Sequence, residues 1–543
     1  MTLPAARTRL GIALISLAVI GAELALMRIL SVRFWSHFAA MVISVALLGF
    51  GSSGTALVLL RKRVAAAPRT WLWALGMAMA VSVPVTALLS SRIPVNVEFL
   101  AWDLSRAWSV LLIELLMFVP FFLGGCVIGV ALMDAPDRIG GHYAANLVGS
   151  GAGAVLFVLL MNVLTAEQLL IAVAAVVYLG AAVLVPWRRP GAAIIAAVAA
   201  ALLVLFVVLV PLATPLSQYK MLSMLRDMPG TRELHRAEGP LGRIDVVAGE
   251  TIHYAPGLSL QYMEDLPAHV LLLTDGDRPS PIYDCKRPED WAFMDYTTAA
   301  AGYRARRRPR VLIVGAGGGA DIGLAWYHRC PRIVALEMNG QVIRAMNGPL
   351  RERGGRIYRA PNVAVINREA RGYLAAAGER FDLIQLPPVG AFGAVGSGVT
   401  ATQESYLLTV ESVAAMLGRL SDGGVLCITR DAQSPPRGGL RAFAVAAEAM
   451  RKEGLDPAPR MALLRSWSTV TLLAAKRPLT PEQTRALRRF ARRRNFDLCY
   501  LPDLAAAEAN QYHVLDRPYY FEAARAMLGP GRDALFRDYL FDI

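Results

Sequence analysis

The chain has 543 residues, of which 55% are hydrophobic and 18% are charged, and its mean hydropathy is +0.43. This balance excludes a single soluble domain, because soluble globular domains carry about 25% charged residues. The formal net charge is +14. The basic runs flank apolar segments and lack interleaved aromatic residues, so we expect contact with anionic lipid headgroups or plain solvation and no nucleic-acid partner. These runs are Arg61–Arg63, Arg188–Arg189 and Arg492–Arg494.

The first 212 positions hold most of the apolar residues, in seven runs of about the 20 residues that a bilayer-spanning helix requires. The first run contains Glu23 and Arg28 and no small-residue cleavage site, so we interpret it as a retained helix and not as a signal peptide. The sequence therefore predicts an N-terminal α-helical transmembrane bundle over residues 1–212. The seven runs lie near residues 10–30, 37–60, 71–90, 108–133, 143–164, 166–186 and 191–212.

Two of the apolar runs contain an acid, Glu23 and Glu114. A carboxylate at bilayer depth is costly, so it normally faces the bundle interior, pairs with a cation or serves a function. Glu23 precedes Arg28 by five positions, which favours a structural ion pair. A path for a substrate or a proton is the alternative.

Small residues mark one of the predicted membrane helices. Gly149 and Gly153 are four positions apart, a spacing that lets two helices approach closely. Asn146, one turn earlier, can form a hydrogen bond between helices. Tight helix packing is the prediction for this segment.

The remainder of the chain has the composition of a globular protein. Residues 240–285 alternate short apolar runs with turns, which predicts a small antiparallel sheet. From residue 311 predicted strands alternate with helices, which is typical of a doubly wound, mostly parallel sheet. We therefore expect a linker and β-hairpin subdomain over 213–308 and an α/β Rossmann-like domain over 309–543. Its strands are predicted at 311–314, 332–336, 363–366, 381–386, 424–429 and 468–474.

The most informative segment runs from Val311 to Glu337. An apolar, β-branched strand is followed at once by glycines, where the chain must turn tightly and lie close to a ligand. A second apolar strand ends in the acid Glu337, about 20 positions further on. Glycines leave room for a nucleoside, and a carboxylate accepts hydrogen bonds from ribose hydroxyls. The alternative is a turn that only packs a helix against a strand. The glycines are Gly315, Gly317, Gly318 and Gly319.

Ligands of doubly wound sheets bind at the carboxyl ends of the strands. Four segments of this chain follow predicted strands, and we expect them to converge on one crevice. They are residues 315–321, Glu337, Asn367–Glu369 and Gln385–Gly390.

Cysteine and histidine show no metal-binding pattern. The five cysteines are scattered without CxxC spacing, and the histidines have no ligand spacing with one another or with cysteine. We expect neither disulfides nor a metal site, and free thiols suit a reducing compartment. The cysteines are Cys126, Cys285, Cys330, Cys427 and Cys499.

Taken together, these segments resemble the spermidine synthase (polyamine aminopropyltransferase) family, and more narrowly the bacterial membrane proteins in which such a domain follows transmembrane helices. The resemblance implies an N-terminal β-hairpin domain followed by a methyltransferase-like Rossmann domain, with S-adenosylmethionine or its decarboxylated form as co-substrate. In the membrane half it rests on Gly21–Glu23, Arg28–Leu30 and Gly141–Gly153. In the soluble half it rests on Leu273–Asp277, 311–337, Phe381–Ile384, Glu404–Tyr406, Gly423–Leu426 and Asp516–Pro518.

The resemblance also implies roles for individual residues. Glu337 matches the acid that holds the ribose, and Glu369 falls where the family has an aspartate that reads the adenine amino group. The glycine loop, with Gly315, Gly317 and Gly319, lies against the nucleoside. Asp321 could replace the family's loop aspartate, whose position is taken here by Gly318, only from a shifted position.

The family's catalytic aspartate is absent. It should follow Phe381–Ile384, where this chain has Gln385, Leu386, Pro387 and Pro388, and Gly390 stands at a second acidic position. A primary amine with a pKa of about 10 is protonated near pH 7, so its attack requires a base. The resemblance therefore does not extend to spermidine synthesis by the usual mechanism.

Other acids are candidates for the base. Asp295 replaces the last residue of the family's Tyr-His-Glu near the polyamine site and is the leading candidate. Asp275 is the second candidate, with a plain hairpin turn over 275–277 as the alternative. Tyr406 and Glu404 are candidates for the substrate side of the crevice.

Three classes of function follow. The first is an enzyme that transfers an alkyl group from an adenosyl sulfonium donor to an amine or another nucleophile. The second is a catalytically altered module that senses an adenosyl ligand or a polyamine, and the third is a transport-associated or scaffold protein. The candidate partners are the lipid bilayer, a small-molecule acceptor such as a polyamine, and a second copy of the chain in a homodimer.

The sequence gives conflicting indications of the side of the membrane on which the soluble half lies. Basic residues at the N-terminus and in alternate loops place the N-terminus in the cytoplasm. Seven crossings would then export the soluble half, whereas adenosyl donors and free thiols indicate the cytoplasm. We expect a multi-pass protein of the bacterial inner membrane with a cytoplasmic soluble half, which requires one apolar run not to cross.

Overall fold

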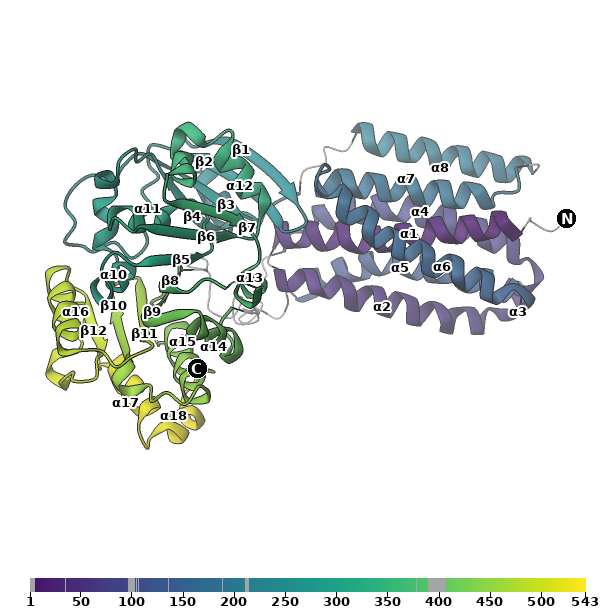
Figure 1. Cartoon of the computed structure of the whole chain (residues 1–543). Coiled ribbons are helices and arrows are strands. Elements are labelled where there is room, and N and C mark those ends of the chain that lie inside the picture. The colour runs from purple at the N-terminus through teal and green to yellow at the C-terminus, as the bar shows by residue number, and fades with distance from the viewer. Residues whose placement is uncertain are drawn as a thin grey trace. The chain divides into compact units, whose positions relative to one another are not determined.

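The computed structural model describes residues 5–34, 36–95, 103, 105, 107–134, 136–187, 189–209, 214–376, 378–388 and 407–543. The chain divides into two compact units (Figure 1). The first comprises the described residues up to Met224 together with Ala237–Arg243. The second comprises Leu225–Arg236 and the other described residues from Ile244 onward.

The first unit is helical. Within its described residues, seven helices are long and apolar enough to cross a membrane, which confirms the seven predicted runs. The helices are α1 (Ala5–Arg33), α2 (Ser36–Leu59), α4 (Pro68–Arg92), α5 (Ala107–Asp134), α6 (Ile139–Leu160), α7 (Ala166–Leu184) and α8 (Pro190–Leu209), with a short α3 (Arg61–Ala66) after α2.

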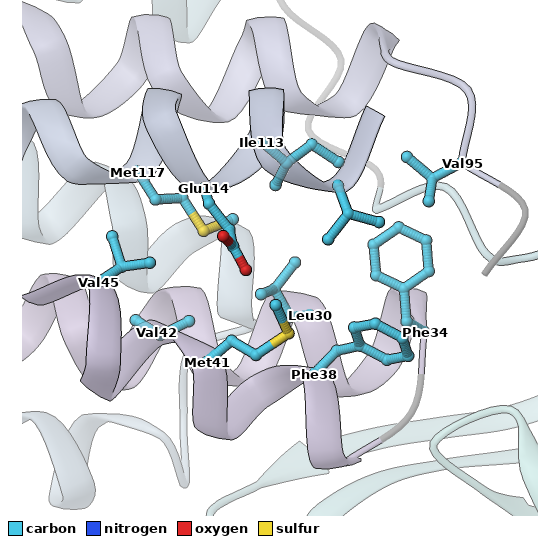
Figure 2. Close-up of a pocket in the computed structure, with 11 residues that line it drawn as sticks. Leu30, Phe34, Phe38, Met41, Val42, Val45, Val95, Ile113, Glu114 and Met117 are labelled. Atoms are coloured by element: carbon cyan, nitrogen blue, oxygen red, sulfur yellow. The ribbon is translucent and has the colours of Figure 1, made fainter. Parts of the chain in front are cut away.

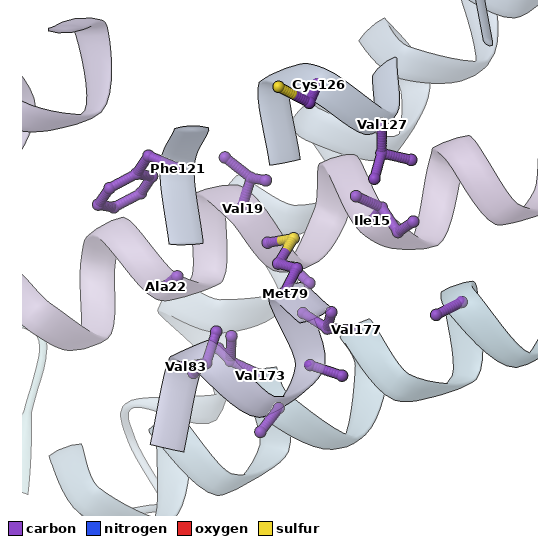
Figure 3. Close-up of a cluster of buried hydrophobic side chains, with 14 of the residues drawn as sticks. Ile15, Val19, Ala22, Met79, Val83, Phe121, Cys126, Val127, Val173 and Val177 are labelled. Atoms are coloured by element: carbon purple, nitrogen blue, oxygen red, sulfur yellow. The ribbon is translucent and has the colours of Figure 1, made fainter. Parts of the chain in front are cut away.

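Helix α1 lies at the centre of this unit and contacts α2, α5, α6 and α7. Ile15 and Val19 of α1 are buried in a cluster with Met79 of α4, Val127 of α5 and Val177 of α7 (Figure 3). Lipid tails are as apolar as these side chains, so close packing and dispersion, more than removal from water, hold such a bundle together.

The predicted small-residue contact is confirmed and joins α6 to α1. A Cβ atom on Gly149 would overlap the carbonyl oxygen of Ala13, and one on Gly153 would lie 2.6 Å from that of Leu17. Ser16 Oγ donates a hydrogen bond to Asn146 Oδ1 across the same pair of helices, at 2.8 Å. The backbones of α1 and α6 are therefore in direct contact.

One acid of the bundle, Glu23, differs from the expectation of an ion pair. Among the described residues, neither Glu23 nor Glu114 has a hydrogen bond or an ion pair, so the predicted pair between Glu23 and Arg28 is not formed there.

A four-stranded sheet, most of whose residues belong to the second unit, has the order β1-β2-β3-β4, and its strand β3 pairs antiparallel with both β2 and β4. Residues 258–260, which also have a strand-like pattern, make only an isolated bridge from Leu258 to Thr297. The strands are β1 (Arg232–Gly239), β2 (Gly242–Ala248), β3 (His269–Thr274) and β4 (Asp277–Tyr283).

The larger sheet has eight strands in the order β12-β10-β11-β9-β8-β5-β6-β7. Strands β5 to β9 run parallel, and β11 is antiparallel to both β9 and β10. All six predicted strands are present, and two short ones, β10 and β12, were not predicted. The strands are β5 (Arg310–Val314), β6 (Arg332–Glu337), β7 (Val363–Asn367), β8 (Phe381–Leu386), β9 (Leu420–Asp431), β10 (Met461–Arg465), β11 (Thr469–Ala475) and β12 (Asp497–Tyr500).

Helices cover both faces of this sheet (Figure 1). One face packs against α13 (Ala370–Ala376), α14 (Val410–Gly418), α15 (Gly438–Lys452) and α17 (Tyr519–Leu528). The strands also contact α10 (Ala301–Ala305), α11 (Ala320–Tyr327), α12 (Gly340–Asn347) and α16 (Pro481–Arg493). The remaining helical segments are α9 (Met221–Arg226), α18 (Arg532–Asp538), and the 3₁₀ segments η3 (Pro136–Arg138), η4 (Pro288–Tyr296), η5 (Thr298–Ala300), η6 (Arg351–Arg353), η7 (Gly355–Arg359), η8 (Ala458–Arg460) and η9 (Ala506–Glu508).

The strand order determines where a ligand can bind. From β5 the chain adds β6 and β7 on one side and then β8 and β9 on the other. The order therefore reverses between β5 and β8, and doubly wound sheets bind ligands outside the carboxyl ends of the strands at this reversal.

Candidate functional site

A pocket lies at the strand-order reversal, with about 750 Å³ of space not occupied by atoms, part of which is open to solvent. Gly315 and Ala316, which follow β5, and Pro387 and Pro388, which follow β8, form part of its wall. Further lining residues come from β4, η5, and the strands β9 and β11; they include Ser280, Pro281, Tyr283, Thr298, Thr429 and Thr469. Two of the four segments expected to converge here, 315–321 and 385–388, line this cavity, whereas Glu337 and Asn367–Glu369 do not. We call it the switch-point pocket.

The positions of the loop after β5 require glycine for different reasons. Gly315, Gly317 and Gly319 have φ angles of +100°, +50° and +88°, a region that favours glycine. A Cβ atom on Gly315 would meet nothing within 4 Å, whereas one on Gly318 would overlap the carbonyl oxygen of Pro281. Gly315 thus leaves open space toward a ligand, and the packing at Gly318 leaves no room for an aspartate.

Hydrogen bonds hold this loop in place from three sides. The Gly318 amide donates to Ser280 Oγ at 2.7 Å, and the Tyr358 hydroxyl donates to the Gly317 carbonyl at 2.6 Å. The Gly317 amide donates to Glu337 Oε2 at 3.0 Å. The loop is therefore preorganised before any ligand binds.

Glu337 ends β6 directly beneath this loop. Its second oxygen, Oε1, accepts from the Asn339 amide at 2.8 Å. Burial raises the pKa of Glu337, and the hydrogen bonds from the Asn339 and Gly317 amides limit the rise. A carboxylate offers about four acceptor positions. Backbone amides use part of this capacity, those of Gly317 and Asn339 among them, and Glu337 does not itself line the switch-point pocket.

Asp321 is the acid that the structure places in the switch-point pocket. It stands in the first turn of α11 and lines the pocket. Gln385 Nε2 donates a hydrogen bond to Asp321 Oδ1, and Gln385 Oε1 accepts one from the Tyr303 hydroxyl at 2.8 Å. Burial raises the pKa of Asp321 to about 6, against the opposing effect of the Gln385 hydrogen bond. A carboxyl group with such a pKa can accept a proton near neutral pH.

Asp295, the leading candidate from the sequence, lies elsewhere and is surrounded by cations. Arg304 and Arg494 both donate hydrogen bonds to its carboxylate, and His328 Nε2 lies 3.0 Å from Oδ1. Burial alone would raise the pKa of Asp295, but the His328 hydrogen bond and the charges of Arg304 and Arg494 outweigh it and lower the pKa. Asp295 does not line the pocket. This geometry is that of an ion cluster, and the sequence-based assignment of Asp295 as a base stays a prediction.

Asp275 occupies a hairpin turn. It follows β3, and its φ of +53° together with +74° at Gly276 is the geometry of a two-residue turn between β3 and β4. Arg278 NH2 lies 3.7 Å from Asp275 Oδ2. Asp275 is not among the residues that line the pocket, so the turn interpretation explains its position.

Glu369 caps a helix. Its two carboxylate oxygens accept from the amides of Arg371 and Gly372, each at 2.7 Å, at the start of α13. The side chain is exposed and does not line the switch-point pocket. Its assignment to adenine stays a prediction. Glu404, Tyr406 and Gly390 lie outside the described residues.

Two features of the site were not found from the sequence. The hydroxyls of Thr298 and Thr469 lie 2.8 Å apart on the pocket wall, beside Thr429. Asp431 ends β9 opposite Thr469 but does not itself line the pocket; burial, against the charge of Arg430, raises its pKa to about 6. Thr429 and Thr469 lie near the ends of otherwise apolar strands, and this sequence pattern could have predicted the polar part of the pocket wall.

The described residues contain no group of three or more His, Cys, Asp or Glu side chains that could hold a metal ion. All five cysteines are buried and free.

No protein-family model matches the sequence, and no curated protein is similar to it. Solved structures whose backbone is partly similar to that of this chain include spermidine synthase from Thermotoga maritima and a spermidine synthase in complex with the transition-state analogue AdoDATO. Each is 17% identical, covers 52% of this chain and 84% of the solved chain, and has a TM-score of 0.32. A probable spermidine synthase from Corynebacterium glutamicum, also 17% identical, covers 47% and 86% with a TM-score of 0.31. Likenesses this distant decide neither fold nor function, so the strand order and the pocket carry the conclusions.

Proposed function

We propose that this chain is a membrane-anchored transferase that binds an adenosyl sulfonium donor in the switch-point pocket and alkylates a nucleophilic acceptor. The donor class, S-adenosylmethionine or its decarboxylated form, follows from the motif resemblance. One observation carries the proposal: the Asp321 carboxyl group, with a pKa of about 6, lines the same pocket as the open side of Gly315.

The residues of the loop suit the nucleoside part of such a donor. Gly315 leaves space for close approach, and Glu337 retains acceptor positions for ribose hydroxyls. A bound sulfonium donor supplies an electrophilic carbon and a thioether leaving group. The chain must then hold the acceptor in line with that carbon, and such positioning is a large part of the catalysis of bimolecular reactions.

Asp321 supplies the proton chemistry. An acceptor amine arrives mainly as an ammonium ion, because its pKa is about 10. Asp321 takes one proton from it, which frees the nitrogen lone pair. The lone pair forms the new C–N bond while the C–S bond breaks and its electron pair stays on sulfur. Gln385, fixed by Tyr303, orients the Asp321 carboxylate throughout.

The pocket limits the charge of the acceptor. Among the described residues that line it, Asp321 is the one charged side chain, and the others are apolar, hydroxyl-bearing or glycine. A long polyamine with several ammonium groups would leave charges without partners, which is costly in an enclosed site. Pro387 lines the pocket where the family's catalytic acid would stand. We therefore expect little or no conversion of putrescine to spermidine and an acceptor with a single amine or other nucleophile.

A transfer assay tests this function. The full chain, purified in detergent, is incubated with S-adenosylmethionine labelled in the methyl group, or with decarboxylated S-adenosylmethionine labelled in the aminopropyl group, and a panel of monoamines and polyamines. We expect label in a monoamine product, and we expect Asp321→Asn to lower its rate by about 100-fold or more, the range for loss of a general base.

Two further results are informative. Asp275→Asn makes the same chemical change at the second base candidate from the sequence, and we expect its rate to stay near that of the wild type. Robust spermidine formation unaffected by Asp321→Asn would show that the base is wrongly assigned. Donor binding without label transfer to any acceptor would instead favour the ligand-sensing alternative.

A further inference from the structure

A second cavity lies inside the first unit, where α1, α2 and α5 meet (Figure 2). About 350 Å³ between its walls is not occupied by atoms, part of it open to the surroundings. Ten of its eleven lining residues are apolar, and Glu114 is the one with a charge. The lining consists of Leu30, Phe34, Phe38, Met41, Val42, Val45, Val95, Val110, Ile113, Glu114 and Met117. We call it the bundle cavity.

The lining follows from helix periodicity. The α5 residues that line the cavity are spaced i, i+3, i+4, i+7, which places them on one face of the helix. The α2 residues have the same spacing. These two faces meet across the cavity, and Figure 2 shows the Glu114 carboxylate extending from α5 into the space between them. The faces are Val110, Ile113, Glu114 and Met117 on α5, and Phe38, Met41, Val42 and Val45 on α2.

In a bilayer centred on α5, Glu114 would lie near the boundary between the lipid headgroups and the apolar layer. It is the eighth residue of the 28-residue helix α5, so it stands about 10 Å from the helix start at 1.5 Å per residue. A helix of this length, about 42 Å, exceeds the hydrocarbon core of about 30 Å by about 6 Å at each end if it is centred. The carboxylate thus lies only a few ångströms inside the apolar layer.

No described residue neutralises this carboxylate. Among the described residues Glu114 has neither a hydrogen bond nor an ion pair. Arg33, at the end of α1, donates instead to the carbonyls of Ser90 and Ile93, each at 2.6 Å. An acid at this depth normally finds a partner or serves a function.

We propose that the bundle cavity binds an amphiphile with one alkyl chain and one ammonium group, its chain among the apolar side chains and its ammonium on Glu114. The charge of Glu114 disfavours a fatty acid in the same place, because two like charges would meet in an apolar layer. The ten apolar lining residues disfavour a free polyamine, whose further charges would find no partner.

Binding of dodecylamine tests this site. The full chain is placed in nanodiscs of zwitterionic phosphatidylcholine, and saturable binding of labelled dodecylamine and dodecanol is measured at pH 7.5 after subtraction of empty nanodiscs. An alkylamine is protonated at this pH. We expect dodecylamine to bind at least about tenfold tighter than dodecanol, the lower end of what a charge-assisted hydrogen bond provides.

Two matched variants locate the effect. Glu114→Gln should reduce the preference for the amine to less than about twofold, whereas Glu23→Gln, the same change at the other unpaired acid of the bundle, should leave it at about tenfold. Val42→Phe, which fills the cavity and retains Glu114, should abolish saturable binding of both ligands. Equal affinity of amine and alcohol in the wild type, a preference that survives Glu114→Gln, or unchanged binding in Val42→Phe would each overturn the proposal.

Discussion

Two aspartates show how surroundings divide the roles of one side-chain type. Asp295 is held by Arg304, Arg494 and His328, and its pKa is lowered. Asp321 meets one amide, that of Gln385, and burial raises its pKa to about 6. Only Asp321 can gain and lose a proton near neutral pH, as a general base must.

The two aspartates predict different pH–rate profiles. With Asp321 as the base, kcat/KM should fall about tenfold per pH unit below pH 6 and level off above about pH 7, because only the deprotonated carboxylate accepts a proton. With Asp295 as the base, whose pKa is lowered, no such limb would occur between pH 5 and 7. Initial rates of label transfer from pH 4.5 to 8.5 distinguish the two.

Gln385→Leu supplies the control for this profile. The hydrogen bond from Gln385 favours the charged carboxylate, so its loss should raise the pKa of Asp321 and move the limb to higher pH. If the acid limb does not move in this variant, the group that titrates is not Asp321.

The buried charge of Asp321 should also lower the stability of the fold at the pH at which Asp321 acts as a base. Its pKa in the folded chain is above the ordinary value of 3.8, so its contribution to stability is fully present below about pH 4 and is lost as the pH rises through about 6. Asp321→Asn removes the buried charge. We therefore expect a Tm close to that of the wild type at pH 4 and higher by a few degrees at pH 8. A Tm that falls equally at both pH values would mean that Asp321 has a structural role.

At the scale of elements, the direct contact between α1 and α6 predicts that two glycine-to-alanine variants of α6 differ in stability. Gly149→Ala places a methyl group on the Ala13 carbonyl, so we expect a destabilisation of about 1–3 kcal/mol, the usual cost of overpacking. Gly151 lies on the same helix with nothing within 4 Å of its added Cβ. Gly151→Ala should be neutral or slightly stabilising, since alanine is the better helix former. Unfolding of both variants in mixed micelles of increasing denaturing detergent compares them; equal loss would contradict the close contact.

The elements were more predictable than the contacts between them. The strands β5, β6 and β8 are apolar runs of five or six residues, and their burial on both faces makes them visible in the sequence. The strand β10, Met461–Arg465, has the composition of a helix and becomes a strand because β11 and β12 pair with it. Pairing partners of this kind are set by the tertiary fold.

The site shows the same limit. The glycine loop and Glu337 are close in sequence and were predicted together. The partners of the aspartates are distant: Arg494 lies 199 positions from Asp295, and Gln385 lies 64 positions from Asp321. The sequence alone could not show that one acid would be neutralised and the other left as the charged group of the pocket.

At the scale of the whole molecule, the membrane topology remains a conflict that an experiment can resolve. If all seven candidate helices cross the membrane, the N-terminus and the second unit lie on opposite sides, and the basic loops predict that the N-terminus is inside. The proposed adenosyl donor would instead need the second unit in the cytoplasm, and this is our prediction. A phosphatase fused after Ile543 should be inactive and a fluorescent protein fused there should fluoresce in a bacterial host. The opposite pattern would remove the donor from reach.

Binding of the donor is the central claim, and calorimetry tests it most directly. An adenosyl thioether such as S-adenosylhomocysteine is titrated into the full chain in detergent, with Glu337→Ala and, as a control, Glu352→Ala at an exposed acid on η6. We predict one site per chain, weakened by roughly 1.5–3 kcal/mol in Glu337→Ala, the range for a hydrogen bond to a charged group, and unchanged in Glu352→Ala. Absence of saturable binding to the wild type, or equal affinity in Glu337→Ala, would contradict the account.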